Sequence, residues 1–131
     1  MDIFEFDENL PTVSAFVQQR NKISSNAFET IFKNFTSSFT KQKLYKGWRL
    51  LAVDGSDLHT PTNKNEIASF YPGSNGQKPY NLMHLNALYD IMNNLYVDAI
   101  VQPSHNSNEH KAFVSMVDRD ISTLPTIYIA D

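Results

Sequence analysis

Residues 48–55 read WRLLAVDG, a short and nearly continuous apolar run that is broken by Asp54 and Gly55. A run of this length is typical of a buried strand. The sequence therefore predicts a strand at residues 48–53, with Asp54 at its carboxyl end. A competing interpretation makes Asp54 a turn residue, because Asp before Gly is among the commonest hairpin signals.

The residues after this strand predict a loop, a hairpin, a helix and a last strand. Residues 61–80 contain three Pro and the tetrad GSNG, which indicates a long exposed loop with little regular structure. Residues 83–89 and 95–101 alternate apolar and polar side chains on either side of a turn near Asn93 and Asn94. A helix is expected at about 107–120, with Asn106 and Glu109 as a capping box. Residues 126–130 form a β-prone run that leads to Asp131.

Two short helices are expected before the first strand. Pro11 and Thr12 suit the start of the first helix, which ends before Asn21. The second begins after Asn26 and runs to about Ser38. Its apolar residues at helical spacing are Phe28, Ile31, Phe32, Phe35 and Phe39. Such a pair is compatible with DNA binding, but an aromatic stripe is more often core packing. We divide the chain into a helical segment, 1–44, and an α/β domain, 45–131.

Length and composition fit one folded domain and restrict the chemistry. The chain has 131 residues, of which 41% are hydrophobic and 19% charged. No apolar run approaches the roughly 20 residues that cross a bilayer, and no signal peptide is visible, so a cytosolic protein without a membrane partner is expected. Without cysteine, disulfides and thiolate metal sites are excluded. Any metal is therefore expected to be hard, such as Mg²⁺.

The net charge of -3 hides an uneven distribution along the chain. Residues 18–49 hold seven basic side chains against Glu29 alone, whereas residues 50–131 hold four bases and nine acids. A basic stretch of this kind suits phosphate binding, and an acidic half suits cations. A solvated basic helix face remains the alternative. The candidate DNA-binding residues are Arg20, Lys22, Lys41, Lys43 and Lys46.

The predicted order of elements brings two acids together. A right-handed crossover through the helix would lay the last strand parallel to an earlier one, and the first strand is its natural neighbour. Asp54 and Asp131, which are 131 minus 54 or 77 positions apart, would then lie side by side. Because two adjacent carboxylates repel, a divalent cation would stabilise the pair. This is the arrangement of two-metal phosphoryl transfer.

Three segments carry a resemblance to the DDE catalytic domain of insertion-sequence transposases, of the insertion-sequence-four type. They are LLAVDGSDL at 50–58, LNALYDIMNNLYVDAIVQPSHNSNEHKAFVSMVD at 85–118 and TIYIAD at 126–131. Residues 10–35 also resemble the amino-terminal helices of that family. The resemblance implies an α/β, ribonuclease-H-like mixed sheet in strand–hairpin–helix–strand order, incomplete here and preceded by two helices.

The same resemblance implies an activity. Matching the family's motifs places its first two metal-binding and catalytic acids at Asp54 and Asp131, with Mg²⁺ or Mn²⁺ as the cofactor. The intact enzyme would hydrolyse a phosphodiester at the transposon end and attack target DNA with the freed 3′-hydroxyl. The family's third acid, a glutamate, lies further downstream, so we expect a truncated chain that is inactive in isolation. We also expect a prokaryotic, DNA-associated, cytoplasmic protein. Whether the intact enzyme forms a homodimer is left open.

The remaining acids and the histidines are given no role in catalysis or metal binding. Asp57 is expected to cap or to face water. Further surface acids are expected at Asp90, Asp98, Asp118 and Asp120. The histidines lack the paired spacing of a zinc site, so none is assigned to metal: His59, His84, His105 and His110. Two other functions stay open, namely an inactive remnant or regulator that only binds DNA, and an unrelated small α/β binding domain.

Overall fold

The computed structural model describes residues 12–20, 22–24, 26–39 and 42–130. The chain divides into two compact units, residues 1–35 and residues 36–131, and each is described by itself. Helix α1, Val13–Arg20, lies in the first unit, and helix α2, Ala27–Ser37, begins there. Both helices were predicted, and neither contains a buried residue. None of the described helices is long and apolar enough to cross a membrane.

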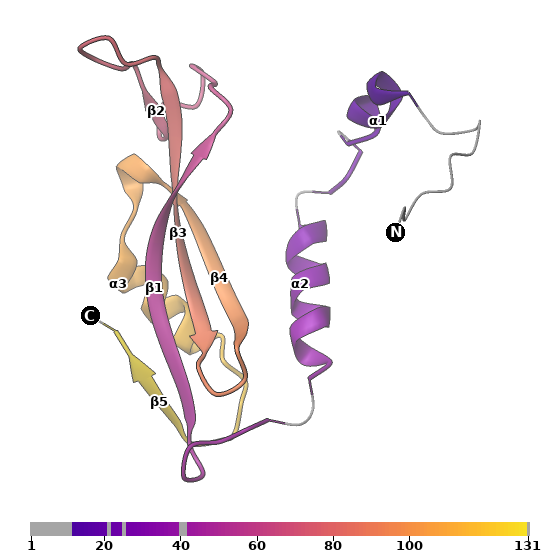
Figure 1. The fold of residues 1–131 in the computed structure, drawn as a ribbon, viewed down its shortest axis with the longest axis vertical. Helices are drawn as coiled ribbons and strands as arrows, with labels where there is room; N and C mark the ends of the chain where they lie inside the picture. Colours follow the sequence, from indigo (N-terminus) through magenta and orange to yellow (C-terminus); the bar gives the residue numbers. More distant parts are fainter. Residues whose placement is uncertain (1–11, 21, 25, 40–41, 131) are drawn as a thin grey trace, which may run out of the picture. The chain divides into compact units, whose positions relative to one another are not determined.

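The second unit is a mixed sheet with one helix packed against it (Figure 1). Its described strands are β1 Arg49–Thr60, β2 Phe70–Tyr71, β3 Tyr80–Asp90, β4 Leu95–Pro103 and β5 Thr126–Ile129. Strand β3 pairs antiparallel with β1, β2 and β4, whereas β5 lies parallel to β1. A short 3-10 helix η1, Ser104–Asn106, and helix α3, Glu109–Asp118, connect β4 to β5. The mixed α/β class, the hairpin and the parallel last strand are therefore confirmed.

Strand β1 does not end at Asp54. It continues to Thr60, and β3 pairs with it from Leu51 opposite Asp90 to Thr60 opposite Asn81. The prediction that Asp54 closes the strand was wrong because the backbone groups beyond it are satisfied by β3, a strand that comes 20 residues or more later in the sequence. The turn interpretation also fails, because Asp54 and Gly55 lie inside the ladder.

The segment 61–80 is more ordered than predicted. It contains β2 and the first residue of β3, and its first half is fastened to the buried Asn81. The Asn81 side chain accepts a hydrogen bond from Asn63 N at 2.7 Å and donates to Asn63 O at 3.1 Å and Ser69 Oγ at 2.9 Å. Such a fully bonded amide holds a loop that hydrophobic packing alone would leave free.

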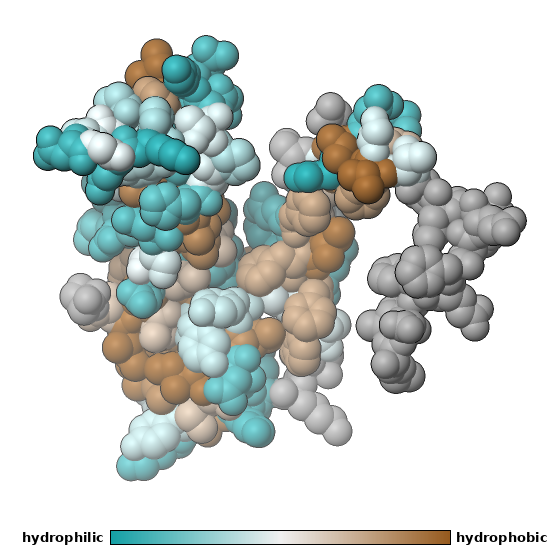
Figure 2. Space-filling view, turned by 45° about the horizontal axis from the view of Figure 1, so that its top comes forward, coloured by the Kyte–Doolittle hydropathy of each residue, from teal (hydrophilic) through white to brown (hydrophobic). Residues whose placement is uncertain are grey.

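The core lies between the sheet and α3. Leu51, Leu88 and Met116 are fully buried, and Ala112 is buried beside them on α3. Partly buried residues pack around this cluster: Val53, Val97, Ile100 and Tyr128. Figure 2 shows a mainly hydrophilic surface at the end of the sheet that carries β2, and apolar surface over the opposite half. The apolar contacts are therefore concentrated in one half of the sheet.

Arg49 is a structural residue at the start of β1. Its side chain is buried and donates to Asp120 Oδ2 at 2.7 Å, which also accepts from the Tyr128 hydroxyl at 3.0 Å. Burial, with the Asp120 hydrogen bond, raises the pKa of Tyr128. Arg49 thus belongs to the fold rather than to the basic surface expected at 18–49, and Asp120 is not a free surface acid.

The hairpin between β3 and β4 is fixed by a buried carboxylate. Asp90 accepts from Met92 N and Asn93 N, both at 3.0 Å, and from the Asn93 side chain at 2.9 Å. Asn94 takes a positive φ of 52°, which Asn tolerates better than most residues. The turn was predicted here, but the expectation that Asp90 is a surface acid was wrong, because its carboxylate serves the turn.

Candidate functional site

A pocket of about 210 Å³ lies where β1, the first turn of α3 and the residue after β5 meet. Its polar walls come from Asp54, Asn86, Glu109 and His110, and Val53, Gly55, Phe113 and Ala130 complete it. Its lining residues include two acids, Asp54 and Glu109, and one histidine, His110. It therefore contains the first of the two acids that the sequence singled out.

Asp54 is exposed and carries no ion pair to any residue that the structure describes. Its Oδ1 accepts from Gly55 N at 2.8 Å, which leaves lone pairs on both oxygens for a ligand. Its Cα pairs with that of Ala87 on β3. The carboxylate is thus held on a rigid strand and remains accessible.

Asp131 lies outside the described residues, so its meeting with Asp54 stays a prediction. The described part of the β1–β5 ladder runs from Arg49 opposite Thr126 to Ala52 opposite Ile129, a constant offset of 77 positions. Ala130, the next residue of the chain, lines the pocket together with Asp54. The same offset separates Asp54 from Asp131 in the sequence.

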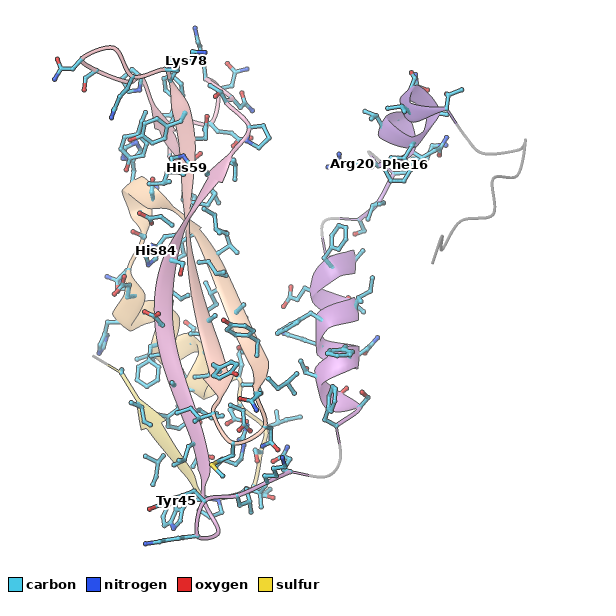
Figure 3. The ribbon with its side chains drawn as sticks, viewed as in Figure 1. Phe16, Arg20, Tyr45, His59, Lys78 and His84 are labelled. Atoms are coloured by element: carbon cyan, nitrogen blue, oxygen red, sulfur yellow. The ribbon has the colours of Figure 1, made fainter. Side chains whose placement is uncertain are left out.

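His84 links two carboxylates beside this pocket. Its Nδ1 lies 2.9 Å from Asp57 Oδ1, and its Nε2 lies 2.9 Å from Glu109 Oε1 (His84 is labelled in Figure 3). The contact with Asp57 is a hydrogen bond between directly opposed residues of β1 and β3. Because Nε2 has no aligned acceptor among the described residues, the approach of Glu109 is a charge contact. We call this arrangement the His84 bridge.

The bridge raises the pKa of His84 above 6.5, chiefly through the hydrogen bond to Asp57. Burial opposes the shift, and the negative charges of Glu109 and Asp57 reinforce it. His84 is only 14% exposed, whereas both carboxylates are more than half exposed, at 58% and 68%. The bridge joins β1, β3 and the start of α3, and solvent screens its charges on the carboxylate side.

Gly55 makes the bridge sterically feasible. A Cβ at this position would lie 2.7 Å from His84 Nε2 and 3.0 Å from Glu109 Oε1. Only a residue without a side chain allows the imidazole and the carboxylate to meet over the strand at this point. The Asp54-Gly55 pair resembles a turn signal in the sequence. In the structure it is an acid followed by the glycine over which the His84 and Glu109 side chains come together.

The start of α3 is tied to the pocket by amide side chains. Asn108 caps the helix by accepting from Lys111 N at 2.8 Å, whereas the predicted cap, Asn106, ends η1. Gln102 Oε1 accepts from Asn108 N at 3.0 Å and from the buried Asn86 at 3.4 Å. The pocket wall thus has a fixed position relative to β3 and β4.

The predicted DNA-binding residues are divided between the two separately described units. Arg20 and Lys22 are exposed in the first unit, and Lys43 and Lys46 are exposed in the second. Lys41 lies outside the described residues. Lys46 sits at the tip of a tight turn with φ of 49°, its Nζ 5.4 Å from the centre of the Tyr45 ring.

Sequence reasoning missed the His84 bridge. Asp57 was expected to cap or to face water, His84 was given no metal-binding role, and Glu109 was considered only for capping. No group of three His, Cys, Asp or Glu side chains that could hold a metal ion occurs within the described residues. The alternation of residues 83–89 indicates on which face of its strand His84 lies. Which residue of β1 lies opposite His84 depends on the β1–β3 register, and the segment 61–79 separates these strands in the sequence.

Comparison with protein-family models, with curated proteins and with solved structures found no match to this chain. Functional inference therefore rests on the residues and geometry described above.

Proposed function

We propose that this chain forms part of a DDE-type transposase catalytic domain, in which Asp54 and Asp131 bind Mg²⁺ or Mn²⁺ for phosphoryl transfer on DNA. The observation that carries the proposal is the parallel pairing of β1 with β5 at an offset of 77 positions. Two further pairs at this offset would bring Asp131 opposite Asp54. Parallel neighbours point their side chains to the same face of a sheet.

The sheet topology supports a ribonuclease-H-like fold. The order along the chain is a strand, an antiparallel hairpin, a helix and a strand parallel to the first. The long strand β1 is central, with β3 on one side and β5 on the other. A central strand is the position from which one acid can reach acids from neighbouring elements.

The donor set at the pocket suits a hard cation. The carboxylate of Asp54 is exposed, and Asn86 and Glu109 are further oxygen-bearing residues in the lining of the same pocket. Mg²⁺ prefers oxygen ligands and keeps several waters, so one or two protein carboxylates suffice for weak binding. When bound, such ions activate the attacking oxygen and stabilise the leaving oxygen.

A titration with Mn²⁺ or Mg²⁺ tests this proposal. We expect amide resonances around Asp54, Gly55 and Ala130 to shift with Mg²⁺ and to broaden with Mn²⁺, and the response to vanish in Asp54→Asn. Asp118→Asn, an exposed acid at the far end of α3, is the matched control and should respond like the parent chain. A response that is absent, or that survives Asp54→Asn, would sink the proposal.

A second function, DNA binding without catalysis, is favoured by one observation. Four of the five candidate cations, Arg20, Lys22, Lys43 and Lys46, are described and all four are exposed. Binding through these cations should weaken steeply as salt rises, since phosphate contacts release counterions. Salt-sensitive binding without a localised metal response would favour this function over the first.

A further inference from the structure

Four aromatic rings from four separate segments make contact in series at the β2 end of the sheet. His59 of β1 lies 5.2 Å from Tyr80 of β3, Tyr80 stacks on Tyr71 of β2 at 5.1 Å and 10°, and Tyr71 lies 4.4 Å from His105 of η1, all measured between ring centres. We call this set the ring row. It lies outside the core cluster, and its outer members, His59 and His105, are exposed.

The ring row is held in place by hydrogen bonds. His105 Nε2 lies 3.0 Å from Phe70 O, and His105 N donates to Ala68 O at 3.1 Å. Ser104 Oγ donates to the Tyr71 hydroxyl at 3.1 Å. His105 and Tyr71 are therefore organised before any partner arrives, which lowers the entropic cost of binding.

Two lysines, with the acid Glu66, lie in the segment that joins β1 to β3 and that also contributes Tyr71 to the row. Lys64 and Lys78 are exposed, and neither is paired with a carboxylate of a described residue. Figure 3 shows Lys78 and His59 toward the same end of the sheet, with His84 further along and Tyr45 at the other end. Flat rings beside lysines are the elements with which proteins bind unpaired nucleic acid strands, because bases stack on rings and phosphates attract cations.

We propose that the ring row is a binding surface for unpaired DNA, with a base stacked on the exposed ring of His59 and phosphates near Lys78. This deepens the proposed function, on which the choice of DNA rests, and adds a surface separate from the Asp54 pocket. The His84 bridge lies between the two on β1 and β3, since Asp57 falls between Asp54 and His59. The proposed DNA surface and the pocket thus share strand β1, which contributes His59 to the first and Asp54 to the second.

Fluorescence anisotropy with labelled single strands dT12 and dA12, and with the duplex made from them, tests the proposal. We expect tighter binding of the single strands than of the duplex. His59→Ala should weaken single-strand binding about tenfold, within the range known for lost base stacking. His59→Phe should preserve the affinity, because it retains a flat ring. Lys78→Gln should reduce both affinity and its salt dependence.

Tyr96→Ala is the matched control, because Tyr96 is an exposed ring on β4 that contacts Tyr89 beside the β3–β4 turn and is not a member of the row. It should bind like the parent chain. The proposal is overturned if the duplex binds as tightly as the single strands, if His59→Ala binds like the parent, or if His59→Phe behaves like His59→Ala. The metal titration of the parent chain separates the two proposals: single-strand binding without a localised metal response retains the surface and rejects the transposase site. Asp54→Asn should lose the metal response and keep the single-strand binding.

Discussion

The two halves of β1 are stabilised by different forces. From Arg49 to Val53 the strand packs against α3 through Leu51 and is bounded by β5. From Asp54 to Thr60 it is largely exposed and is held by polar contacts such as the His84 bridge. The first half provides stability, and the second presents chemically active side chains on a rigid support. The two tasks meet at Val53, which packs against the core cluster and also lines the pocket.

The largest predicted effect lies in the first half, at the Arg49–Asp120 pair. Asp120→Ala would leave the Arg49 guanidinium buried without its carboxylate, and Arg49 is only 4% exposed. We expect a loss of about 3–5 kcal/mol in the free energy of unfolding. Urea denaturation followed by circular dichroism measures it. The double variant Arg49→Met/Asp120→Leu should regain much of the loss. If it is destabilised as much as Asp120→Ala, the loss does not come from an unpaired buried charge.

The next effect separates the two halves directly. Leu88→Ala removes a fully buried side chain from the cluster with Leu51 and Met116, and should cost about 2–5 kcal/mol. Leu58→Ala, in the exposed half, removes a side chain that is 39% exposed, and should cost well under that, about 0.5–1 kcal/mol. The midpoints of urea unfolding compare the two. Similar losses would mean that β1 is packed evenly along its length.

Gly55→Ala tests close approach at the boundary between the halves. The added methyl would meet His84 Nε2 at 2.7 Å, so we expect a loss of about 1–3 kcal/mol from overpacking. Thermal and urea unfolding would report it. In the His84→Ala background the same substitution has room, and should cost less. If the two losses simply add, Gly55 and His84 do not interact.

The pH dependence of stability tests the His84 bridge. The folded-state pKa of His84 lies above its ordinary value of 6.5. The stabilisation by protonated His84 is therefore fully present below 6.5 and is lost as pH rises through the folded-state pKa. Because the carboxylates are largely solvated, we expect only about 0.5–1 kcal/mol. Denaturation from pH 5.5 to 9 should show this loss in the parent chain and not in His84→Gln; parallel profiles would argue against the bridge.

The smallest predicted effect on stability belongs to Asp54. Asp54→Asn should change the free energy of unfolding by less than about 0.5 kcal/mol, because the exposed carboxylate has no ion pair within the described residues. The loss of the Asp54 carboxylate should be detected only as a loss of metal binding. A strong destabilisation by Asp54→Asn would show that the carboxylate serves the fold, and would weaken its assignment as a metal ligand.

Local patterns predicted those elements whose cause is local. Alternation predicted β3 and β4, helical spacing predicted α3, and the pair Asn93-Asn94 marked the turn between the two strands. The parallel placement of the last strand followed from the crossover rule, which depends only on the order of elements. The pairing of Asp54 with Asp131 was predicted from the same rule and awaits the titration.

The extent of β1 was not predictable in this way. Asp54 and Gly55 interrupt the apolar run, and their sequence alone favours a turn. Pairing with β3 overrides that preference, since the ladder satisfies the backbone groups of the whole strand. The same reasoning explains Asp90, whose carboxylate is buried because the turn supplies three donors to it.

The sequence by itself determined the order of elements, the hairpin and a candidate pair of acids, because these follow from side-chain periodicity and chain order. Only the tertiary structure decided that Asp54 lies inside a strand, that Glu109 and His84 approach over Gly55, and that His59, Tyr80, Tyr71 and His105 form a row. These contacts depend on the register of β3 against β1 and β2. Register is set by the packing of the whole sheet rather than by any one segment.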